Sequence, residues 1–295
     1  MTAALHIYPG FEAPALCLAR HLGVQTRAVD IHVFPDGESK VTVATDDDTA
    51  IIYASLDHPN EKLVPLMLAA GALRQGGVKR LVLVCPYLCY MRQDKAFTPG
   101  EAISQQIIGP WLASGFDRIV TVDPHLHRVS SLAEVFVDTE ADALTAASLI
   151  GRAVADDPAT GNAVLVGPDA ESRQWVSLAA RQAGLDYLVA EKVRHGDRKV
   201  DISLPGADAV RGRPAVIVDD LISSGATAMK CAELLYAAGA DSVEAVATHV
   251  LARVDDLAAL QKTGVVRVRS TDSILHESNA ISLAPLLAEA LEREV

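Results

Sequence analysis

Short apolar runs rich in valine and isoleucine alternate along the chain with longer stretches rich in alanine and leucine. Apolar runs of this length are typical of parallel strands buried on both faces, and the stretches between them are typical of helices that cover such a sheet. The pattern therefore predicts an α/β fold. The predicted strands are Ala50–Ala54, Arg80–Cys85, Arg118–Asp123, Ala163–Gly167, Ala215–Asp219, Val243–His249 and Val265–Val268.

Two helices are predicted with specific bounds. Thr98 and Glu101 have the spacing of a capping box, with Pro99 in the first turn, which predicts a helix that starts there and ends near Gly115. A second helix is predicted from Thr139 to Asp156.

The two halves of the chain echo each other. The segments KRLVLVCPY and DRIVTVD of the first half resemble NAVLVGPD and RPAVIVDD of the second half. Two similar α/β halves would each offer a crevice at the carboxyl ends of their strands, where such folds bind ligands. We expect two domains, residues 1–143 and 144–295.

The composition is that of a globular protein with a sizeable core. Half of the 295 residues are apolar, and the formal net charge is −12. That charge argues against a general nucleic-acid surface and means that anionic substrates need local basic residues. The four cysteines lack metal-ligand spacing and indicate reduced thiols. Because no apolar run reaches the about 20 residues that span a bilayer, and the N-terminus lacks a signal-peptide pattern, a cytoplasmic protein without a membrane partner is expected.

The stretch VIVDDLISSGAT, residues 216–227, carries the strongest functional signal. An apolar strand ends in Asp219 and Asp220, and a loop of small residues then opens into a helix. Backbone N–H groups at the positive end of that helix can converge on a phosphate monoester. The two carboxylates would repel that phosphate, so we expect them to bind a sugar cis-diol or a metal ion. The residues expected to cradle the phosphate are Ser223, Ser224, Gly225, Ala226 and Thr227.

A ribose 5-phosphate fits both ends of this stretch. The alternative is an ordinary strand-to-helix turn with one capping aspartate.

Two cations, Lys192 and Arg194, are separated by one residue, so an extended strand would present both on one face. They could clamp one phosphate chain, because attack of a sugar hydroxyl on phosphorus asks the protein mainly for positioning and positive charge. The polar run His195–Lys199 suggests a loop that closes over substrate. The alternative is a solvated basic hairpin.

Other polar residues follow predicted strands. His125 comes two residues after Asp123, and Asp169 comes soon after the strand that ends at Gly167, so both are expected near the crevice. Magnesium is plausible there; because it prefers oxygen ligands, a histidine that only supports a ligand is the alternative for His125. The segment FPDGE, residues 34–38, has the composition of a hairpin turn.

The chain is similar to the ribose-phosphate pyrophosphokinase family in six ordered segments that cover nearly its whole length. The last of them also resembles the phosphoribosyl-pyrophosphate loop of the type I phosphoribosyltransferase-like fold. The resemblance implies two tandem domains of that fold with mostly parallel sheets. It also implies transfer of the β,γ-diphosphate of ATP to the anomeric hydroxyl of ribose 5-phosphate, giving phosphoribosyl pyrophosphate and AMP. The segments are FPDGE, PYLCYMRQDKAFTPGEAIS, TVDPHLH, GPD, EKVRHGDR and VDDLISSGAT.

The resemblance further implies roles for individual residues. Residues matching Phe34, Asp36 and Glu38 are lent by a neighbouring subunit to hold adenine, which implies a homo-oligomer based on dimers, such as a hexamer, with shared nucleotide sites. Arg92 and Gln93 match ATP-contacting residues; a surface arginine is the alternative for Arg92. The remaining matches are His125 and Asp169 at a magnesium–ATP site, His127 beside them, and Lys192 and Arg194 as the catalytic pair.

Two segments depart from the usual family pattern. GPDAESRQW lacks the glycine pair after the aspartate, and DPHLHRVSSLAEVF replaces a shorter run, so nucleotide allostery is not implied. A phosphoribosyltransferase that consumes the activated sugar and a non-catalytic regulatory subunit remain as alternatives. The tandem halves argue against the first, and Lys192 with Arg194 argues against the second.

Overall fold

The computed structural model describes residues 2–126, 131–195 and 199–295, with backbone only for residues 192–195 and 199–202. The chain forms two compact units. Unit 1 comprises Met1–Leu144, Ser273–Leu275 and Ser282–Val295, and unit 2 comprises Thr145–Asp272 and His276–Ile281. The C-terminal residues, which the sequence-based division assigned to the second half, therefore pack with unit 1.

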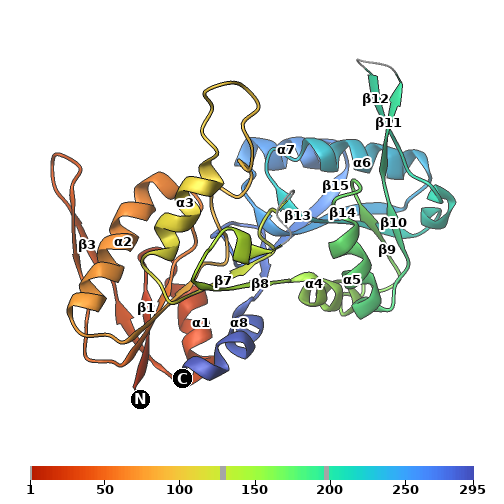
Figure 1. Cartoon of the computed structure of the whole chain (residues 1–295). Helices are drawn as coiled ribbons and strands as arrows, with labels where there is room; N and C mark the ends of the chain where they lie inside the picture. Colours follow the sequence, from red (N-terminus) through yellow and green to blue (C-terminus); the bar gives the residue numbers. More distant parts are fainter. Residues whose placement is uncertain (1, 127–130, 196–198) are drawn as a thin grey trace. The chain divides into compact units, whose positions relative to one another are not determined.

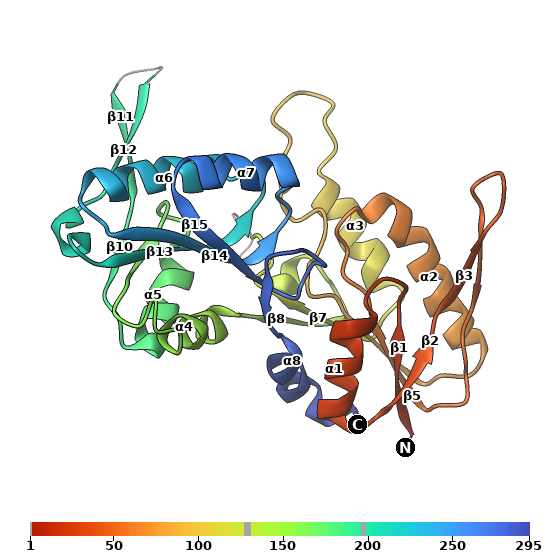
Figure 2. The same ribbon diagram turned by 180° about the vertical axis from the view of Figure 1, so that it is seen from behind.

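Unit 1 is built on a parallel sheet of six strands in the order β2-β1-β5-β6-β7-β8 (Figure 1). Helices α2 and α3 cover one face and α1 and α8 the other (Figures 1 and 2). The strands are β1 Ala3–Ile7, β2 Gln25–Ala28, β5 Thr49–Tyr53, β6 Arg80–Val84, β7 Arg118–Val122 and β8 Glu140–Leu144. The helices are α1 Glu12–Leu22, α2 Pro59–Gln75, α3 Ser104–Ala113 and α8 Ala284–Leu291.

Unit 2 repeats this topology with the strand order β10-β9-β13-β14-β15-β16, again all parallel. The strands are β9 Val164–Gly167, β10 Tyr187–Val189, β13 Pro214–Ile222, β14 Ser242–Val250, β15 Val265–Thr271 and β16 Asn279–Ile281. The helices are α4 Ala147–Ala155, α5 Arg173–Ala183, α6 Ala226–Ala237 and α7 Val254–Lys262. The mostly parallel α/β fold predicted from the sequence is confirmed.

Each unit also carries an antiparallel hairpin between the second and third strands of its sheet, counted along the chain. In unit 1 the hairpin pairs β3 Asp30–Val33 with β4 Ser39–Thr42. In unit 2 it pairs β11 Glu191–His195 with β12 Lys199–Ser203. Both hairpins extend from the sheets (Figure 1). The internal echo of the sequence thus corresponds to two copies of one topology.

All seven predicted strands are present, because their apolar side chains form the core of each unit. The helix predicted from Thr139 to Asp156 is wrong in its first part: residues 140–144 form β8, and only the later part is helical, as α4. The helix predicted from Thr98 is also wrong at its start, since α3 begins at Ser104. No helix in the described ranges is long and apolar enough to cross a membrane.

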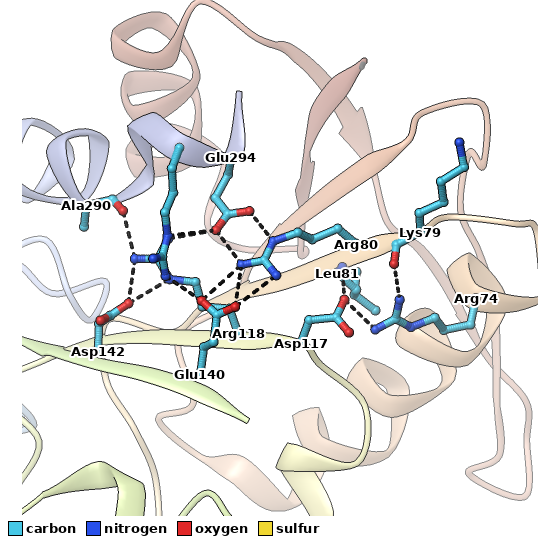
Figure 3. Close-up of polar contacts among 11 residues, drawn as sticks. Arg74, Lys79, Arg80, Leu81, Asp117, Arg118, Glu140, Asp142, Ala290 and Glu294 are labelled. Carbon is cyan, nitrogen blue, oxygen red and sulfur yellow. Dashed lines mark hydrogen bonds and ion pairs between the residues drawn. The ribbon is translucent and has the colours of Figure 1, made fainter. Parts of the chain in front are cut away.

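Charged side chains tie the C-terminal segment to the sheet of unit 1. The Glu294 carboxylate lies between the guanidinium groups of Arg80 and Arg118, which donate hydrogen bonds to it over 2.6–2.9 Å (Figure 3). Arg118 also donates to Asp142 on β8 at 2.7 Å, and Arg80 pairs with Glu140 at 3.2 Å. These interactions explain how β8, with its two carboxylates, forms an edge strand and why Ser282–Val295 belongs to unit 1.

Candidate active site

The paired aspartates lie inside β13, which continues to Ile222 and not, as predicted, only to Asp219. Asp220 is buried, and Asp219 is partly exposed. Burial, followed by repulsion from Asp220 and from Asp169, raises the pKa of Asp219 well above its usual range. Three carboxylates of unit 2 therefore act on one another near the carboxyl ends of β9 and β13.

The loop after β13 turns into α6 through Gly225. Its φ of 73° is in the left-handed region, and a Cβ at this position would lie 2.8 Å from the Leu260 Cδ1. Only glycine satisfies both constraints without strain. The first helical hydrogen bond runs from Met229 N–H to Gly225 O at 2.8 Å, so the N–H groups of Ala226 and Thr227 in the first turn have no partner within the helix. Ser223 and Ser224 complete the predicted phosphate loop.

Asp169 follows β9 and closes a tight turn before α5. Its Oδ1 accepts hydrogen bonds from the backbone N–H groups of Glu171 at 3.1 Å and Ser172 at 3.2 Å. The Ser172 hydroxyl in turn donates to Asp169 O at 2.6 Å and accepts from Asp169 N–H at 3.3 Å. Asp169 is thus held at the strand end, where its charge reaches Asp219.

Lys192 and Arg194 occupy alternate positions of β11, in register with Ile202 and Val200 of β12. The predicted extended strand is present, and so is its antiparallel partner. The side chains of both residues, and residues 196–198 of the predicted closing loop, lie outside what the structure describes.

Phe34, Asp36 and Glu38 form the turn of the unit 1 hairpin, as the FPDGE composition predicts. Phe34 and Glu38 are joined by a backbone hydrogen bond of 2.7 Å, Gly37 has a φ of 90°, and the Asp36 Oδ1 accepts from Glu38 N–H at 3.1 Å. All three predicted side chains are exposed, and the Phe34 ring packs edge-on against His32. A hollow of about 810 Å³ separates this turn from α2.

Arg92 and Gln93 lie in the long loop between β6 and α3. Arg92 is exposed, whereas the Gln93 amide donates to the Glu101 Oε1 at 2.7 Å. The Glu101 Oε2 accepts from the backbone N–H groups of Phe97 at 2.7 Å and Thr98 at 3.0 Å. These bonds, led by the one from Phe97, lower the pKa of Glu101. Glu101 thus organises this loop instead of capping a helix.

His125 follows β7 through Asp123, which has a φ of 39°. Asp123 N–H donates to Leu144 O at 2.8 Å, which fixes this turn beside β8. A left-handed non-glycine residue is unfavourable by about 1–2 kcal/mol, so the turn is held by its surroundings. His127 lies outside the described residues.

The predicted site residues thus fall into two groups. The sugar-phosphate loop, the paired aspartates, Asp169 and the Lys192–Arg194 strand belong to unit 2, and the predicted ATP residues belong to unit 1. Within the described ranges, no three His, Cys, Asp or Glu side chains are grouped to hold a metal ion. Sequence reasoning gave no role at this site to Glu101 or Ser172. The Thr98–Glu101 spacing did signal that a carboxylate reaches back to a backbone N–H.

Comparison with known proteins identifies the family. Residues 12–114 match the model of the N-terminal domain of ribose phosphate pyrophosphokinase, and residues 138–283 match that of the phosphoribosyl transferase domain. The chain is 32% identical to the ribose-phosphate pyrophosphokinase of Methanopyrus kandleri, over 93% of this chain and 94% of that protein. It is also 32% identical to ribose-phosphate pyrophosphokinase 2 of Archaeoglobus fulgidus, over 97% of this chain and 99% of that protein.

A solved structure gives the same result for the whole chain. The crystal structure of phosphoribosylpyrophosphate synthetase from Mycobacterium smegmatis superimposes with a TM-score of 0.83 and 26% identity, covering 99% of this chain and 98% of that one. Both family models, full-length relatives and a full-length structure agree, and the chain belongs to the ribose-phosphate pyrophosphokinase family.

Proposed function

We propose that the chain transfers the β,γ-diphosphate of ATP to the anomeric hydroxyl of ribose 5-phosphate, giving phosphoribosyl pyrophosphate and AMP. Family membership over both units supports this reaction. The observation that carries the proposal is the junction at Gly225. Here a partly exposed carboxylate, Asp219, and a buried one, Asp220, precede a helix N-terminus whose backbone conformation only glycine adopts without strain.

Unit 2 binds the sugar phosphate in this proposal. The first-turn N–H groups of α6 and the hydroxyls of Ser223, Ser224 and Thr227 receive the 5-phosphate, because a helix N-terminus favours an anion. Asp219 and Asp220 accept hydrogen bonds from the ribose hydroxyls, which relieves the repulsion between the two neighbouring carboxylates. The anomeric hydroxyl is then oriented for attack.

Lys192 and Arg194 supply positive charge to the diphosphate group as it is transferred. Phe34, Asp36 and Glu38 hold adenine from a neighbouring copy of the chain, and Arg92 and Gln93 contact ATP with His125. The exposure of the Phe34 ring, 41%, supports a role at a surface shared between copies. A homo-oligomer with shared nucleotide sites and a cytoplasmic location are parts of this proposal.

Magnesium is the proposed cofactor, and the donor chemistry fits it. Asp169 offers carboxylate oxygen at a strand end close enough to Asp219 for the two carboxylates to repel each other, and a cation there would relieve that repulsion. Because Mg²⁺ keeps several waters and binds through one or two carboxylates plus substrate phosphates, a cluster of three protein ligands is not required. Asp169 would hold the ion in unit 2, and His125 is the separate candidate ligand that family resemblance gives in unit 1. The bound ion would neutralise charge on the triphosphate.

An assay with ATP, magnesium and ribose 5-phosphate tests the proposal by measuring AMP and phosphoribosyl pyrophosphate together. Equal appearance of both products is expected. Exchange of a nucleobase that depends on pyrophosphate, with no AMP formed, would indicate a phosphoribosyltransferase instead. Absence of both activities in the folded protein would indicate a regulatory subunit.

A further inference from the structure

The turn that carries Asp169 is held by two sets of hydrogen bonds, one made by the Asp169 carboxylate and one made by the Ser172 hydroxyl. Asp169 Oδ1 already accepts from the N–H groups of Glu171 and Ser172, in the turn that precedes α5. In addition, the Ser172 hydroxyl bonds both main-chain polar groups of Asp169, donating to its carbonyl oxygen at 2.6 Å and accepting from its N–H at 3.3 Å. The side chain of each residue therefore holds the backbone of the other.

The hydrogen bonds of the Ser172 hydroxyl are buried, and they depend on the small size of Gly167, which packs against this hydroxyl. Ser172 is fully buried. A Cβ on Gly167, the last residue of β9, would lie 2.5 Å from the Ser172 Oγ and 3.1 Å from the Val176 Cγ1. Glycine at the strand end therefore leaves space for the Ser172 hydroxyl. Because the site is buried, loss of this hydroxyl would leave the N–H and carbonyl groups of Asp169 without these hydrogen bonds.

We propose that Ser172 is a positioning residue that sets the direction in which Asp169 presents its carboxylate to the metal–triphosphate. The inference rests on the proposed function, in which Asp169 holds the metal ion. Fixing both the N–H and the carbonyl of Asp169 fixes its backbone dihedrals, and these fix the direction of its Cα–Cβ bond.

Binding of Mn²⁺ to the full-length protein, followed by electron paramagnetic resonance in the presence of ATP, tests the role without relying on turnover. Ser172→Ala is expected to weaken Mn²⁺ binding about tenfold, as is usual when a group that orients a ligand is lost. In steady-state assays the concentration of Mg²⁺ for half-maximal activity should rise, while KM for ribose 5-phosphate stays unchanged. Ser177→Ala is the matched control, because its hydroxyl donates to Gln174 O on the exposed side of α5.

Gly167→Ala provides a second route to the same result, since the added methyl group displaces the Ser172 hydroxyl without removing it. Wild-type Mn²⁺ affinity in both folded variants would overturn the inference. Asp169→Asn separates this failure from that of the proposed function. If Asp169→Asn weakens Mn²⁺ binding and Ser172→Ala does not, only the positioning role is wrong. If Asp169→Asn leaves Mn²⁺ binding unchanged, the metal assignment fails and the inference falls with it.

Discussion

Arg118 and Glu294 form an ion pair across 176 residues of sequence, with an N···O distance of 2.9 Å. Both side chains are almost fully buried, with exposed fractions of 4% and 1%. A buried charge needs its partner, because removing one member leaves the other desolvated and unpaired. The last residues of the chain are therefore part of the folded core of unit 1.

Glu294→Ala should lower the free energy of unfolding by about 3 kcal/mol, because Arg118 keeps Asp142 but loses its buried partner. Urea denaturation measures the change. Glu292→Ala, at an exposed position of the same C-terminal turn, should change stability by less than about 0.5 kcal/mol. Equal effects of the two substitutions would contradict a specific role for the buried pair.

The same pair predicts a response to acid. Burial alone would raise the pKa of Glu294, but hydrogen bonds from Arg80 and Arg118 outweigh it, and the pKa is lowered from 4.5. The stability that Glu294 provides is therefore fully present above pH 4.5 and is lost as pH falls through the lowered pKa. The difference in stability between wild type and Glu294→Ala should shrink in that range.

His6 is a buried histidine on β1, an interior strand of its sheet, and within the described ranges neither ring nitrogen has a hydrogen-bond partner. Burial lowers its pKa below 6.5, although Asp47 acts in the opposite direction. The unfolded state then binds the proton more readily, so stability should fall as pH drops below about 6.5. Thermal denaturation from pH 8 to 5 should show this loss in wild type and a smaller loss in His6→Leu. The exposed His21→Leu should retain the wild-type profile.

Gly225→Ala should raise KM for ribose 5-phosphate about tenfold. The backbone at this position is left-handed, a conformation that costs a residue with a Cβ about 1–2 kcal/mol. The new Cβ would also overlap Leu260, so the phosphate loop must shift. Gly212→Ala is the matched control, because its φ of 68° imposes the same backbone strain with open space around the Cβ. Steady-state kinetics with each substrate varied should show a change in the first variant only.

Glu101→Gln should raise KM for ATP about tenfold, which corresponds to one lost charged hydrogen bond. The amide presents an N–H₂ group to donors that need an acceptor, namely Gln93, Phe97 and Thr98. KM for ribose 5-phosphate should stay constant. Glu12→Gln is the control, since Glu12 also accepts from a backbone N–H, that of Gly10, away from this loop. An unchanged KM for ATP would remove the loop from nucleotide binding.

Lys192→Ala should lower kcat by a factor that corresponds to about 3 kcal/mol or more, because a charge donor to the transferred group is lost. Binding of ribose 5-phosphate, measured by calorimetry, should change little. Lys230→Ala, at an exposed position of α6, should keep the wild-type kcat. A wild-type kcat in Lys192→Ala would take this residue out of the mechanism.

Local sequence signals were sufficient for much of the fold and of the candidate site. Apolar runs predicted the seven central strands, because residues buried on both faces leave a continuous apolar pattern. The turn at FPDGE and the loop at Gly225 were predictable because their chemistry is contained in a few neighbouring residues.

Tertiary structure decided the elements whose partners lie far away in the chain. The sequence of residues 140–144 predicted a helix, but Arg80 and Arg118 neutralise Glu140 and Asp142 at the sheet edge, so a strand forms. Glu101 has the spacing of a helix cap, yet its carboxylate accepts a hydrogen bond from the Gln93 side chain, and α3 starts only at Ser104. Hydrophobic period and turn chemistry are local properties, whereas the pairing of buried charges depends on which distant segments folding brings into contact.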